Sequence, residues 1–485
     1  MARLEETLHG RRHDPTGGER LAGDRRVPGT GENRVSTPTR NDSVCPQPRG
    51  AAEIEHPEGR THPLSSRPFE IMAPETTPRR RPDPSTGGGQ APGRVVEAFR
   101  ERTGRLPDGV WSAPGRVNLI GEHTDYNGGC VLPFAAPART YVGAGLGKEE
   151  TITLHSVQFP AEDVVASLEG LLAASGPGGQ AVRGWAAYPL GTLWALLRDG
   201  ATCPGLDLVV DSDLPAGSGL SSSAALECAT GLAARDLCRF DATPRRLAEL
   251  AQKGENEYVG VPCGPMDQMA AMACTEGHAL LFDTRDGTLV QEPLEPASHG
   301  LEVLVIDTRV RRALRDGGYV ERRRSCEEAA RRLGVPTLRE VSGAGLGKAL
   351  GGLGDPVLER RVRHVVTENE RVLAVAGLLR RGQVDGVGPL LTASHRSLRD
   401  DFEVSCPELD LAVTSAVHAG ALGARLTGAG FGGNALALVP VALERAVRAA
   451  VEDAFDRAGF ARPVLRLVEP SAGARRDSAA ATLGG

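Results

Sequence analysis

A run of glycines and serines between a predicted strand and a predicted helix is the feature that most limits how this chain can fold. Residues 206–210 form an apolar run of the kind that makes a buried strand. Residues 224–237 have Ala and Leu at helical spacing, which predicts a helix. The loop between them contains Gly217, Ser218, Gly219, Leu220, Ser221, Ser222 and Ser223.

This loop has the features of an anion-binding site. Glycines let the backbone approach a ligand closely and adopt positive φ angles. The N-terminus of the following helix offers unpaired N–H groups and a partial positive charge. The serine hydroxyls can add donors or ligate a magnesium ion. A helix start with serine as its N-cap is the alternative, and the loop alone does not decide between the two.

Two common phosphate-binding loops are excluded. The glycine-serine loop is not a Walker loop, because no Lys-Ser or Lys-Thr pair closes it. Residues 428–433 match the G-x-G-x-x-G pattern of dinucleotide-binding folds. However, an apolar strand-like run follows them, where a dinucleotide fold requires a helix. We therefore do not expect a dehydrogenase.

Composition narrows the class of protein. The 485 residues are enough for two or three domains, and a net charge of -6 argues against nucleic acid as a partner. The nine cysteines include no C-x-x-C pair, so neither a zinc site nor a disulfide framework is expected, and a cytoplasmic location is favoured. No apolar run reaches the roughly 18 residues of a membrane span, so no membrane association is expected.

The chain divides by composition into an extension, two folded parts and a tail. Residues 1–92 are rich in Gly, Pro, Arg, Ser and Thr, which predicts disorder. The alternatives are a basic tail that binds a partner, or a native start at Met72. Mixed strands and helices predict two α+β domains, over residues 93–300 and 301–470. Residues 471–485 are predicted to be a flexible tail.

Further elements follow from periodicity. Residues 95–99 begin a predicted amphipathic helix, and Thr243 is predicted to cap a helix whose first residue is Pro244. Predicted strands lie at residues 151–157, 301–306 and 435–439. Predicted helices lie at residues 322–333, 357–379, 409–419 and 442–458.

A second segment, residues 114–129, packs charged side chains between apolar residues and glycines. It contains Arg116, Glu122, His123 and Asp125. Charged groups in such a frame need a partner or a ligand. Carboxylates and an imidazole suit the hydroxyls of a polyol. The alternative is a surface turn with an internal ion pair.

A third segment, residues 255–269, places Asp267 just after a Gly-Pro turn. Such an aspartate can cap the following helix. It can also act as a base, or as an acceptor that orients a substrate hydroxyl. The neighbouring Cys263 is interpreted as a small buried apolar residue and not as a nucleophile.

Together with residues 423–433, these three segments resemble the motif set of the GHMP kinase superfamily. Residues 115–127 (Gly-Arg-Val-Asn-Leu-Ile-Gly-Glu-His-Thr-Asp-Tyr-Asn) resemble the galactokinase signature within it. The four motifs occur in the family's order over about residues 93–468, which is more specific than any one motif. The resemblance implies an α+β, two-domain GHMP kinase architecture. A domain like the second domain of a small-subunit ribosomal protein would precede a ferredoxin-like domain, with the site between them.

The resemblance also implies roles for individual residues. Asp267 matches the catalytic base and Arg116 its cationic partner, while Ser223 and Glu255 match magnesium positions. The implied sugar contacts are Glu122, His123, Thr124, Asp125, Gly264 and Tyr319. The implied ATP-binding residues are Gly217, Ser218, Gly219, Leu220, Ser221, Ser222 and Ser223.

The implied reaction converts ATP and α-D-galactose to galactose 1-phosphate and ADP, the entry step of galactose metabolism by the Leloir pathway. Mg²⁺ would be the cofactor, ATP the co-substrate, and a monomer is expected. A neighbouring Arg116 favours ionised Asp267 and makes it a weak base, so Arg116 is expected to act mainly on phosphoryl charge. The open question is whether Asp267 acts as a base or only orients the sugar.

Departures from the family pattern are small, and other functions stay open. Pro265 stands where galactokinases commonly carry Ile, and Asn434 stands where Cys is frequent. Pro265 stiffens the turn before Asp267 and could shift sugar affinity.

N-acetylgalactosamine or arabinose is an alternative sugar, whereas residues 124–127 speak against mevalonate. A non-catalytic galactose-sensing regulator on the same fold is a further alternative.

Overall fold

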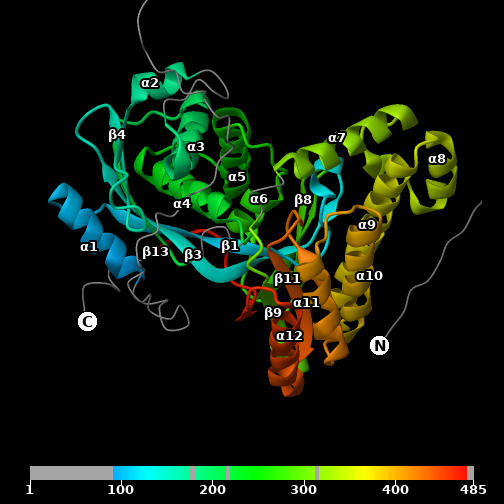
Figure 1. Ribbon diagram of the computed structural model, residues 1–485. Coiled ribbons are helices and arrows are strands. Elements are labelled where there is room, and N and C mark those ends of the chain that lie inside the picture. The colour runs from blue at the N-terminus through cyan, green and yellow to red at the C-terminus, as the bar shows by residue number, and fades with distance from the viewer. Residues whose placement is uncertain (1–90, 175–181, 215–218, 312–315, 478–485) are drawn as a thin grey trace, which may run out of the picture. The chain divides into compact units, whose positions relative to one another are not determined.

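The computed structural model describes residues 91–174, 182–214, 219–311 and 316–477 (Figure 1). The first described element, α1 (Ala91–Thr103), begins two residues before the position where we expected the folded part to start. The predictions made for residues 1–90, including disorder and a start at Met72, lie outside the described residues. Gly217 and Ser218 also lie outside them.

A six-stranded sheet with the order β13-β1-β3-β6-β4-β5 forms the centre of the first folded part. β4 and β6 run parallel, joined through α2 (Leu168–Ala173) and α3 (Ala187–Arg198), while the other described neighbours are antiparallel. The strands are β1 (Gly109–Asn118), β3 (Pro133–Leu146), β4 (Thr151–Ser156), β5 (Val164–Ser167), β6 (Leu206–Ser212) and β13 (Arg475–Asp477).

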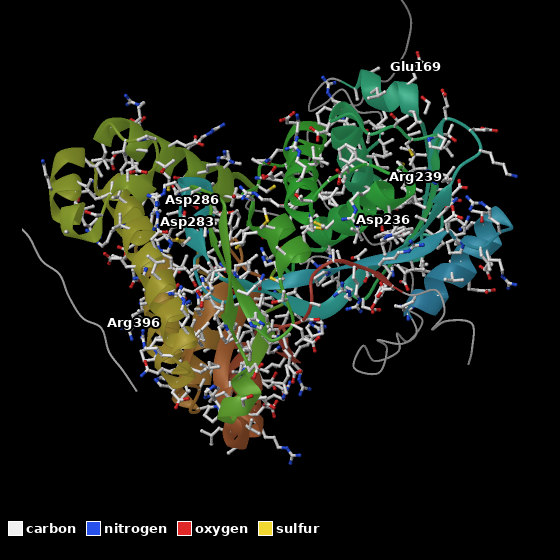
Figure 2. All side chains as sticks on the ribbon, turned by 180° about the vertical axis from the view of Figure 1, so that it is seen from behind. Glu169, Asp236, Arg239, Asp283, Asp286 and Arg396 are labelled. Carbon is white, nitrogen blue, oxygen red and sulfur yellow. The ribbon has the colours of Figure 1, made fainter. Side chains whose placement is uncertain are left out.

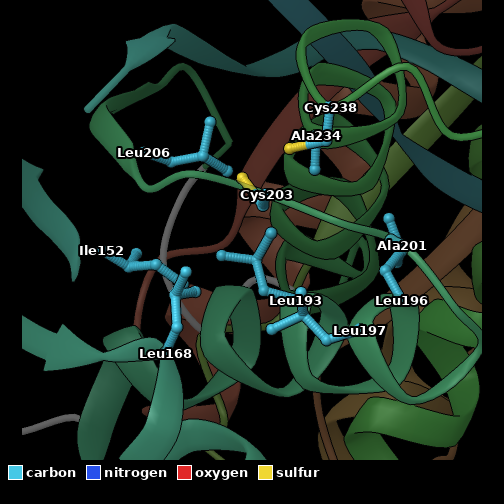
Figure 3. Close-up of a pocket in the computed structure, with 10 residues that line it drawn as sticks. All are labelled: Ile152, Leu168, Leu193, Leu196, Leu197, Ala201, Cys203, Leu206, Ala234 and Cys238. Carbon is cyan, nitrogen blue, oxygen red and sulfur yellow. The ribbon is translucent and has the colours of Figure 1, made fainter. Parts of the chain in front are cut away.

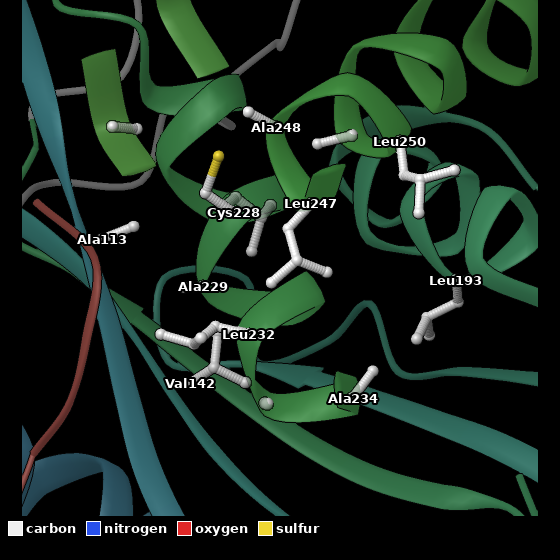
Figure 4. Packing of buried hydrophobic residues seen from close by; sticks show 14 of the residues in the cluster. Ala113, Val142, Leu193, Cys228, Ala229, Leu232, Ala234, Leu247, Ala248 and Leu250 are labelled. Carbon is white, nitrogen blue, oxygen red and sulfur yellow. The ribbon is translucent and has the colours of Figure 1, made fainter. Parts of the chain in front are cut away.

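Helices cover both faces of this sheet (Figure 1). α4 (Ser222–Leu237) and α6 (Met266–Ala273) pack on one face, and α3 and α5 (Pro244–Lys253) pack against α4. α1 lies on the opposite face, where Val95 contacts Gly143. Small residues such as Ala229 let α4 lie close to the sheet, and Leu232 joins the same core as Val142 (Figure 4). The glycine-serine loop is thereby held at the edge of a packed core.

A second, four-stranded antiparallel sheet has the order β10-β11-β9-β12. Its chain order is strand, helices, two strands, helix, strand, which is the β-α-β-β-α-β pattern of a ferredoxin-like domain. The implied C-terminal fold is therefore present. Its strands are β9 (Leu301–Asp307), β10 (Gly423–Thr427), β11 (Asn434–Pro440) and β12 (Val464–Val468). Its helices are α7 (Asp316–Leu333), α8 (Leu346–Leu353), α9 (Pro356–Arg380), α10 (Val387–Asp400), α11 (Pro407–His418) and α12 (Glu444–Ala458).

Both faces of this second sheet are buried. Leu304 and Ile306 of β9 face a core built from the helices of the second part. Val303 and Val305, on the other face, share a core with Leu119 of the first part. Burial of both faces explains why residues 303–306 of β9 are all apolar in the sequence. The shared core joins the two folded parts, beside a small sheet of β2 (Cys130–Val131), β7 (His278–Asp283) and β8 (Thr288–Pro293).

Most predicted elements are confirmed, with ends shifted by a few residues. The strands predicted at 151–157, 206–210, 301–306 and 435–439 are β4, β6, β9 and β11. The helices predicted at 322–333, 357–379, 409–419 and 442–458 are α7, α9, α11 and α12. Thr243 caps α5, because its side chain accepts a hydrogen bond from the Arg246 N–H, and Pro244 is the first residue.

The prediction of a flexible tail over 471–485 is wrong for residues 471–477. The Ser471 N–H donates to the Ala135 carbonyl at 2.8 Å, and β13 pairs with β1. The buried Arg139 also donates to the carbonyls of Ala472 and Gly473. Residues that are distant in the sequence hold this segment in place. Its own composition therefore did not reveal that it is ordered. Residues 478–485 lie outside the described part.

Charged side chains such as Glu169, Asp286 and Arg396 are exposed on the surface (Figure 2). Within the described ranges, no helix combines the length and the apolar character needed to cross a bilayer.

Candidate active site

Arg116 near the end of β1 and Asp267 in the first turn of α6 form a bidentate ion pair. Arg116 Nε donates to Asp267 Oδ1 at 2.9 Å, and Nη2 donates to Oδ2 at 3.0 Å. Arg116 Nη1 donates to the Gly219 carbonyl at 2.8 Å, and Ser221 Oγ donates to Asp267 Oδ2 at 2.5 Å. The three segments singled out in the sequence therefore meet at one point.

The exposure of this pair differs between its members. The Arg116 side chain is 8% exposed, whereas the Asp267 side chain is 28% exposed. Asp267 forms no cap on α6, where Pro265 holds the N-cap position without a side-chain hydrogen bond. The N-cap alternative for Asp267 is thus wrong, because its carboxylate is used by Arg116 and Ser221 instead. A partly exposed acceptor held by a fixed cation remains available to a ligand.

The start of α4 lies directly beside this pair. Gly219 and Ser221 have φ angles of 72° and 58°, in the left-handed region. This turn brings the chain into α4, whose first residues are Ser222 and Ser223. The leading N–H groups of an α-helix have no partner within the helix and attract anions. Leu220 is buried, and its carbonyl accepts from the Arg116 N–H, so it anchors the loop to β1.

Glu255 lies in a π-helical turn (Gly254–Val259) directly after α5. Ser223 lies near enough to the Glu255 carboxylate to favour its ionised form, so the two predicted magnesium positions lie close together. Burial, with the nearby Asp267 charge, raises the pKa of Glu255 to about 7. A hydroxyl and a carboxylate are hard oxygen donors that suit Mg²⁺, which usually completes its shell with phosphate and water. The described residues include no cluster of three or more His, Cys, Asp or Glu that could enclose a metal without such help.

Two buried polar residues beside Glu255 were missed in the sequence. Gln268 Nε2 donates to Glu255 Oε2 at 2.6 Å and to Glu227 Oε2 at 2.9 Å. Burial first, and the Glu255 charge second, raise the pKa of Glu227 well above its usual range. A glutamate among the alanines of α4 was the available signal, because a charge on the buried face of a helix needs a partner.

Asp125 and Gly264 approach each other closely. Asp125 begins a short 3-10 turn, and a Cβ placed on Gly264 would overlap its Oδ2. Any larger residue at position 264 would therefore force the Asp125 carboxylate to move. Burial, with the Asp267 charge second, raises the pKa of Asp125 to about 6. The acidic side chains of the second and third segments thus lie near enough to influence each other.

Glu122 is only 2% exposed and is surrounded by donors. Its Oε2 accepts from Arg425 Nη2 at 2.5 Å and from Asn118 Nδ2 at 2.6 Å. Its Oε1 accepts from the Gly428 N–H at 2.7 Å and from Thr427 Oγ1 at 3.1 Å. The alternative of a surface turn with an internal ion pair is therefore wrong, because Glu122 is buried and its cation comes from a distant segment. Arg425 belongs to the fourth motif and was not assigned a partner from the sequence.

His123 also uses both of its polar atoms within the protein. Its Nε2 lies 3.2 Å from the Ala429 carbonyl, which can only accept, so Nε2 carries the proton. Nδ1 then accepts from the Tyr126 hydroxyl at 2.9 Å. Burial, with the nearby His364 second, lowers the pKa of His123 to about 3. The ring of Tyr319 lies 5.8 Å from His123 and 5.4 Å from Tyr126, so α7 reaches this cluster.

Thr124 differs from the other predicted sugar contacts, because it has no exposed surface. Its hydroxyl lies 2.8 Å from the Gly121 carbonyl and 2.7 Å from the Cys130 carbonyl, both acceptors. The side chain thus holds the loop between β1 and β2 together. Thr124 therefore exposes no atom that could make the sugar contact predicted from the sequence.

A separate small pocket has no part in this cluster. It lies between β4, α2, α3, β6 and α4, and apolar side chains and two thiols line it (Figure 3). The two thiols are those of Cys203 and Cys238. Such a lining offers little to a polar or charged ligand.

Comparisons with known proteins agree with these motifs. Residues 97–146 match the galactokinase galactose-binding signature. Residues 187–275 match the N-terminal domain of GHMP kinases, and residues 375–457 match their C-terminal domain. A galactokinase from Streptomyces coelicolor is 49% identical over 385 residues, or 79% of this chain and 98% of the relative. A galactokinase from Mycobacterium tuberculosis is 44% identical and covers 75% of this chain and 98% of its own length.

Solved structures point the same way. The structure of Lactococcus lactis galactokinase complexed with galactose is 33% identical, with a TM-score of 0.75, and covers 79% of this chain and 99% of that one. A mevalonate kinase structure is 17% identical with a TM-score of 0.52, over 74% of this chain and 98% of that one, which shows a shared fold alone. By its signature, its two domains and its relatives, this chain belongs to the galactokinase family of GHMP kinases.

Proposed function

We propose that this chain transfers the γ-phosphoryl group of ATP to the C1 hydroxyl of α-D-galactose, giving galactose 1-phosphate and ADP. The observation that carries this proposal is the contact network of Arg116, Asp267 and Ser221 at the start of α4. It joins a partly exposed acceptor, a fixed cation and a helix N-terminus. The galactokinase relatives, one of them solved with galactose, supply the sugar.

Asp267 is the proposed acceptor for the proton of the C1 hydroxyl. A bond forms between the sugar oxygen and the γ-phosphorus, and the bond to the β,γ-bridging oxygen breaks. The sugar proton passes to Asp267 and from there to solvent, and ADP departs with the bridging oxygen. Arg116 and Ser221 hold the carboxylate in place, and the arginine charge favours the phosphoryl group as it moves. Positioning and charge neutralisation are the main contributions that proteins make to phosphoryl transfer.

The nucleotide would lie at the start of α4, against Gly219, Ser221, Ser222 and Ser223. Gly217 and Ser218 stay predicted members of the same loop. Ser223 and Glu255 would hold Mg²⁺, which when bound neutralises charge on the phosphates. The proximity of these two residues supports that assignment.

On the sugar side, Asp125, Gly264 and Tyr319 are the proposed binding residues. Asp125 can accept hydrogen bonds from sugar hydroxyls, and Gly264 gives it room. The polar atoms of Glu122 and His123 already have protein partners, so a sugar hydroxyl would share them with those partners. We also propose that the protein is a monomer and that it is located in the cytoplasm.

The test is ADP release measured with ATP and a panel of sugars. Galactose should drive release, whereas N-acetylgalactosamine and arabinose should give far less. Preference for either of those two sugars would replace galactose as the substrate. Galactose binding without ADP release would instead support the sensor alternative and overturn the kinase assignment.

A further inference from the structure

Glu227, Gln268 and Glu255 form a chain of polar side chains within the apolar core. They come from α4, α6 and the π-helical turn, and are 0%, 0% and 6% exposed. The amide of Gln268 donates one hydrogen bond to each carboxylate, at 2.9 Å to Glu227 and 2.6 Å to Glu255. One side-chain amide therefore connects three separate elements.

This arrangement is costly for the fold. The Oε1 atoms of Glu227 and Gln268 are buried and have no hydrogen-bond partner among the described residues. A buried polar atom without a partner destabilises a protein, and apolar residues of similar volume would pack such a place better. A cost of this kind is expected where the orientation of a functional group is required.

The group held in place by this chain of polar side chains is the Glu255 carboxylate. Its Oε2 accepts a hydrogen bond from Gln268 and is contacted by the Cys263 thiol at 3.4 Å. Gln268 directly follows Asp267 on α6. Glu227 lies one turn of α4 beyond Ser223. The chain thus connects both proposed magnesium positions to the helix that carries the proposed base.

We infer that Gln268 and Glu227 are positioning residues that set the orientation of Glu255 toward a Mg²⁺–nucleotide complex. Gln268 acts on Glu255 directly, and Glu227 acts by fixing the amide of Gln268. The inference rests on the magnesium assignment of the proposed function. Residues that orient metal ligands in this way commonly change metal affinity or activity by about 10- to 100-fold when they are removed.

The experiment measures ADP binding by calorimetry, with MgCl₂ and with EDTA, for full-length variants. Gln268→Leu and Glu227→Leu should lower ADP affinity in MgCl₂ by about tenfold or more. ADP affinity in EDTA and galactose affinity should stay within about twofold of the wild type. Glu227→Gln retains an acceptor for Gln268 and should stay close to the wild type.

Thr230→Val is the matched control. Thr230 lies on the same helix one turn further on, is fully buried, and its hydroxyl has no partner among the described residues. The variant therefore tests the loss of a buried polar group on α4 that does not contact Glu227, Gln268 or Glu255 through a hydrogen bond. Melting temperatures of all variants show whether each protein is folded, and Gln268→Leu and Glu227→Leu are independent tests should one fail to fold.

The outcomes separate this inference from the proposed function. A wild type whose ADP affinity is the same with MgCl₂ and EDTA would overturn the magnesium assignment and this inference with it. A magnesium-dependent wild type with unaltered Leu variants would overturn this inference alone. Equal losses of ADP affinity in MgCl₂ and EDTA, together with lost galactose affinity, would show a merely structural role and would also overturn it.

Discussion

Two arginine–carboxylate pairs in this protein are chemically alike but differently placed. Arg116 and Asp267 form a bidentate pair whose carboxylate is 28% exposed. Arg425 and Glu122 form a pair in which the two side chains are 0% and 2% exposed. Asp267 has exposed surface for a ligand, whereas Glu122 is surrounded by four protein donors. We propose that the first pair acts on a substrate, whereas the second joins the two folded parts.

The difference shows that residue type and local motif do not separate function from support. Glu122 and Asp267 both lie in motifs of the family, and both stand next to an arginine in space. Solvent exposure and the number of protein donors distinguish them. Variants in each pair should therefore change different quantities.

Asp267→Asn should produce the largest effect. The loss of a proton acceptor costs on the order of 10²–10⁴-fold in turnover. Galactose affinity should change little, because the amide has a similar shape. The melting temperature should fall less than for Arg425→Met, because Arg116 loses a counter-charge that is partly exposed. Steady-state kinetics and galactose calorimetry check this. Near-normal turnover would refute the base role and leave Asp267 as an orienting acceptor.

Arg425→Met should change stability instead. It leaves the Glu122 charge buried without its cation, and breaking a buried pair in this way costs about 3–5 kcal/mol. Urea denaturation measures the loss in the free energy of unfolding. Arg100→Ala removes an exposed pair with Glu97 on α1 and should cause no measurable change. A similarly small change for Arg425→Met would remove the proposed contrast between the two pairs.

Gly264→Ala should weaken galactose binding, and it should destabilise the fold less than Arg425→Met does. The new Cβ would overlap Asp125 Oδ2, so the carboxylate must move. A crowded core position costs about 1–3 kcal/mol, and we expect at least about a tenfold rise in the KM for galactose. The KM for ATP serves as the internal control. Equal changes in both values would mean that the residue does not act through Asp125.

The smallest predicted effect is the pH dependence linked to Asp125. Its pKa is raised from 3.8 to about 6 in the folded protein, so the folded chain retains a proton that the unfolded chain releases. This contribution to stability is fully present below about pH 4 and is lost as the pH rises through 6. Relative to Asp125→Asn, the wild type should lose up to about 3 kcal/mol between pH 4 and pH 7. A stability difference that is constant with pH would contradict the shift.

Much of the fold followed from local pattern. The Thr243 cap, the strand at residues 206–210 and the helix at 224–237 were predictable, because their signals lie within a few neighbouring residues. The order of residues 471–477 was not predictable, because it depends on β1 and Arg139, far away in sequence. The partner of Glu122 was hidden for the same reason, since Arg425 lies 303 residues away.

The amino-acid sequence by itself determined most of the elements, the family and the candidate residues of the site, but not the buried partners Gln268, Glu227 and Arg425. It could do so because periodicity, turns and motifs are local properties of the chain. Tertiary structure decided which of those residues keep a face toward a ligand. It placed Asp267 of α6 beside the start of α4 with part of its side chain exposed, and it surrounded Glu122, His123 and Thr124 with protein partners. Exposure and hydrogen-bond saturation depend on contacts between distant segments, and so only the folded chain sets them.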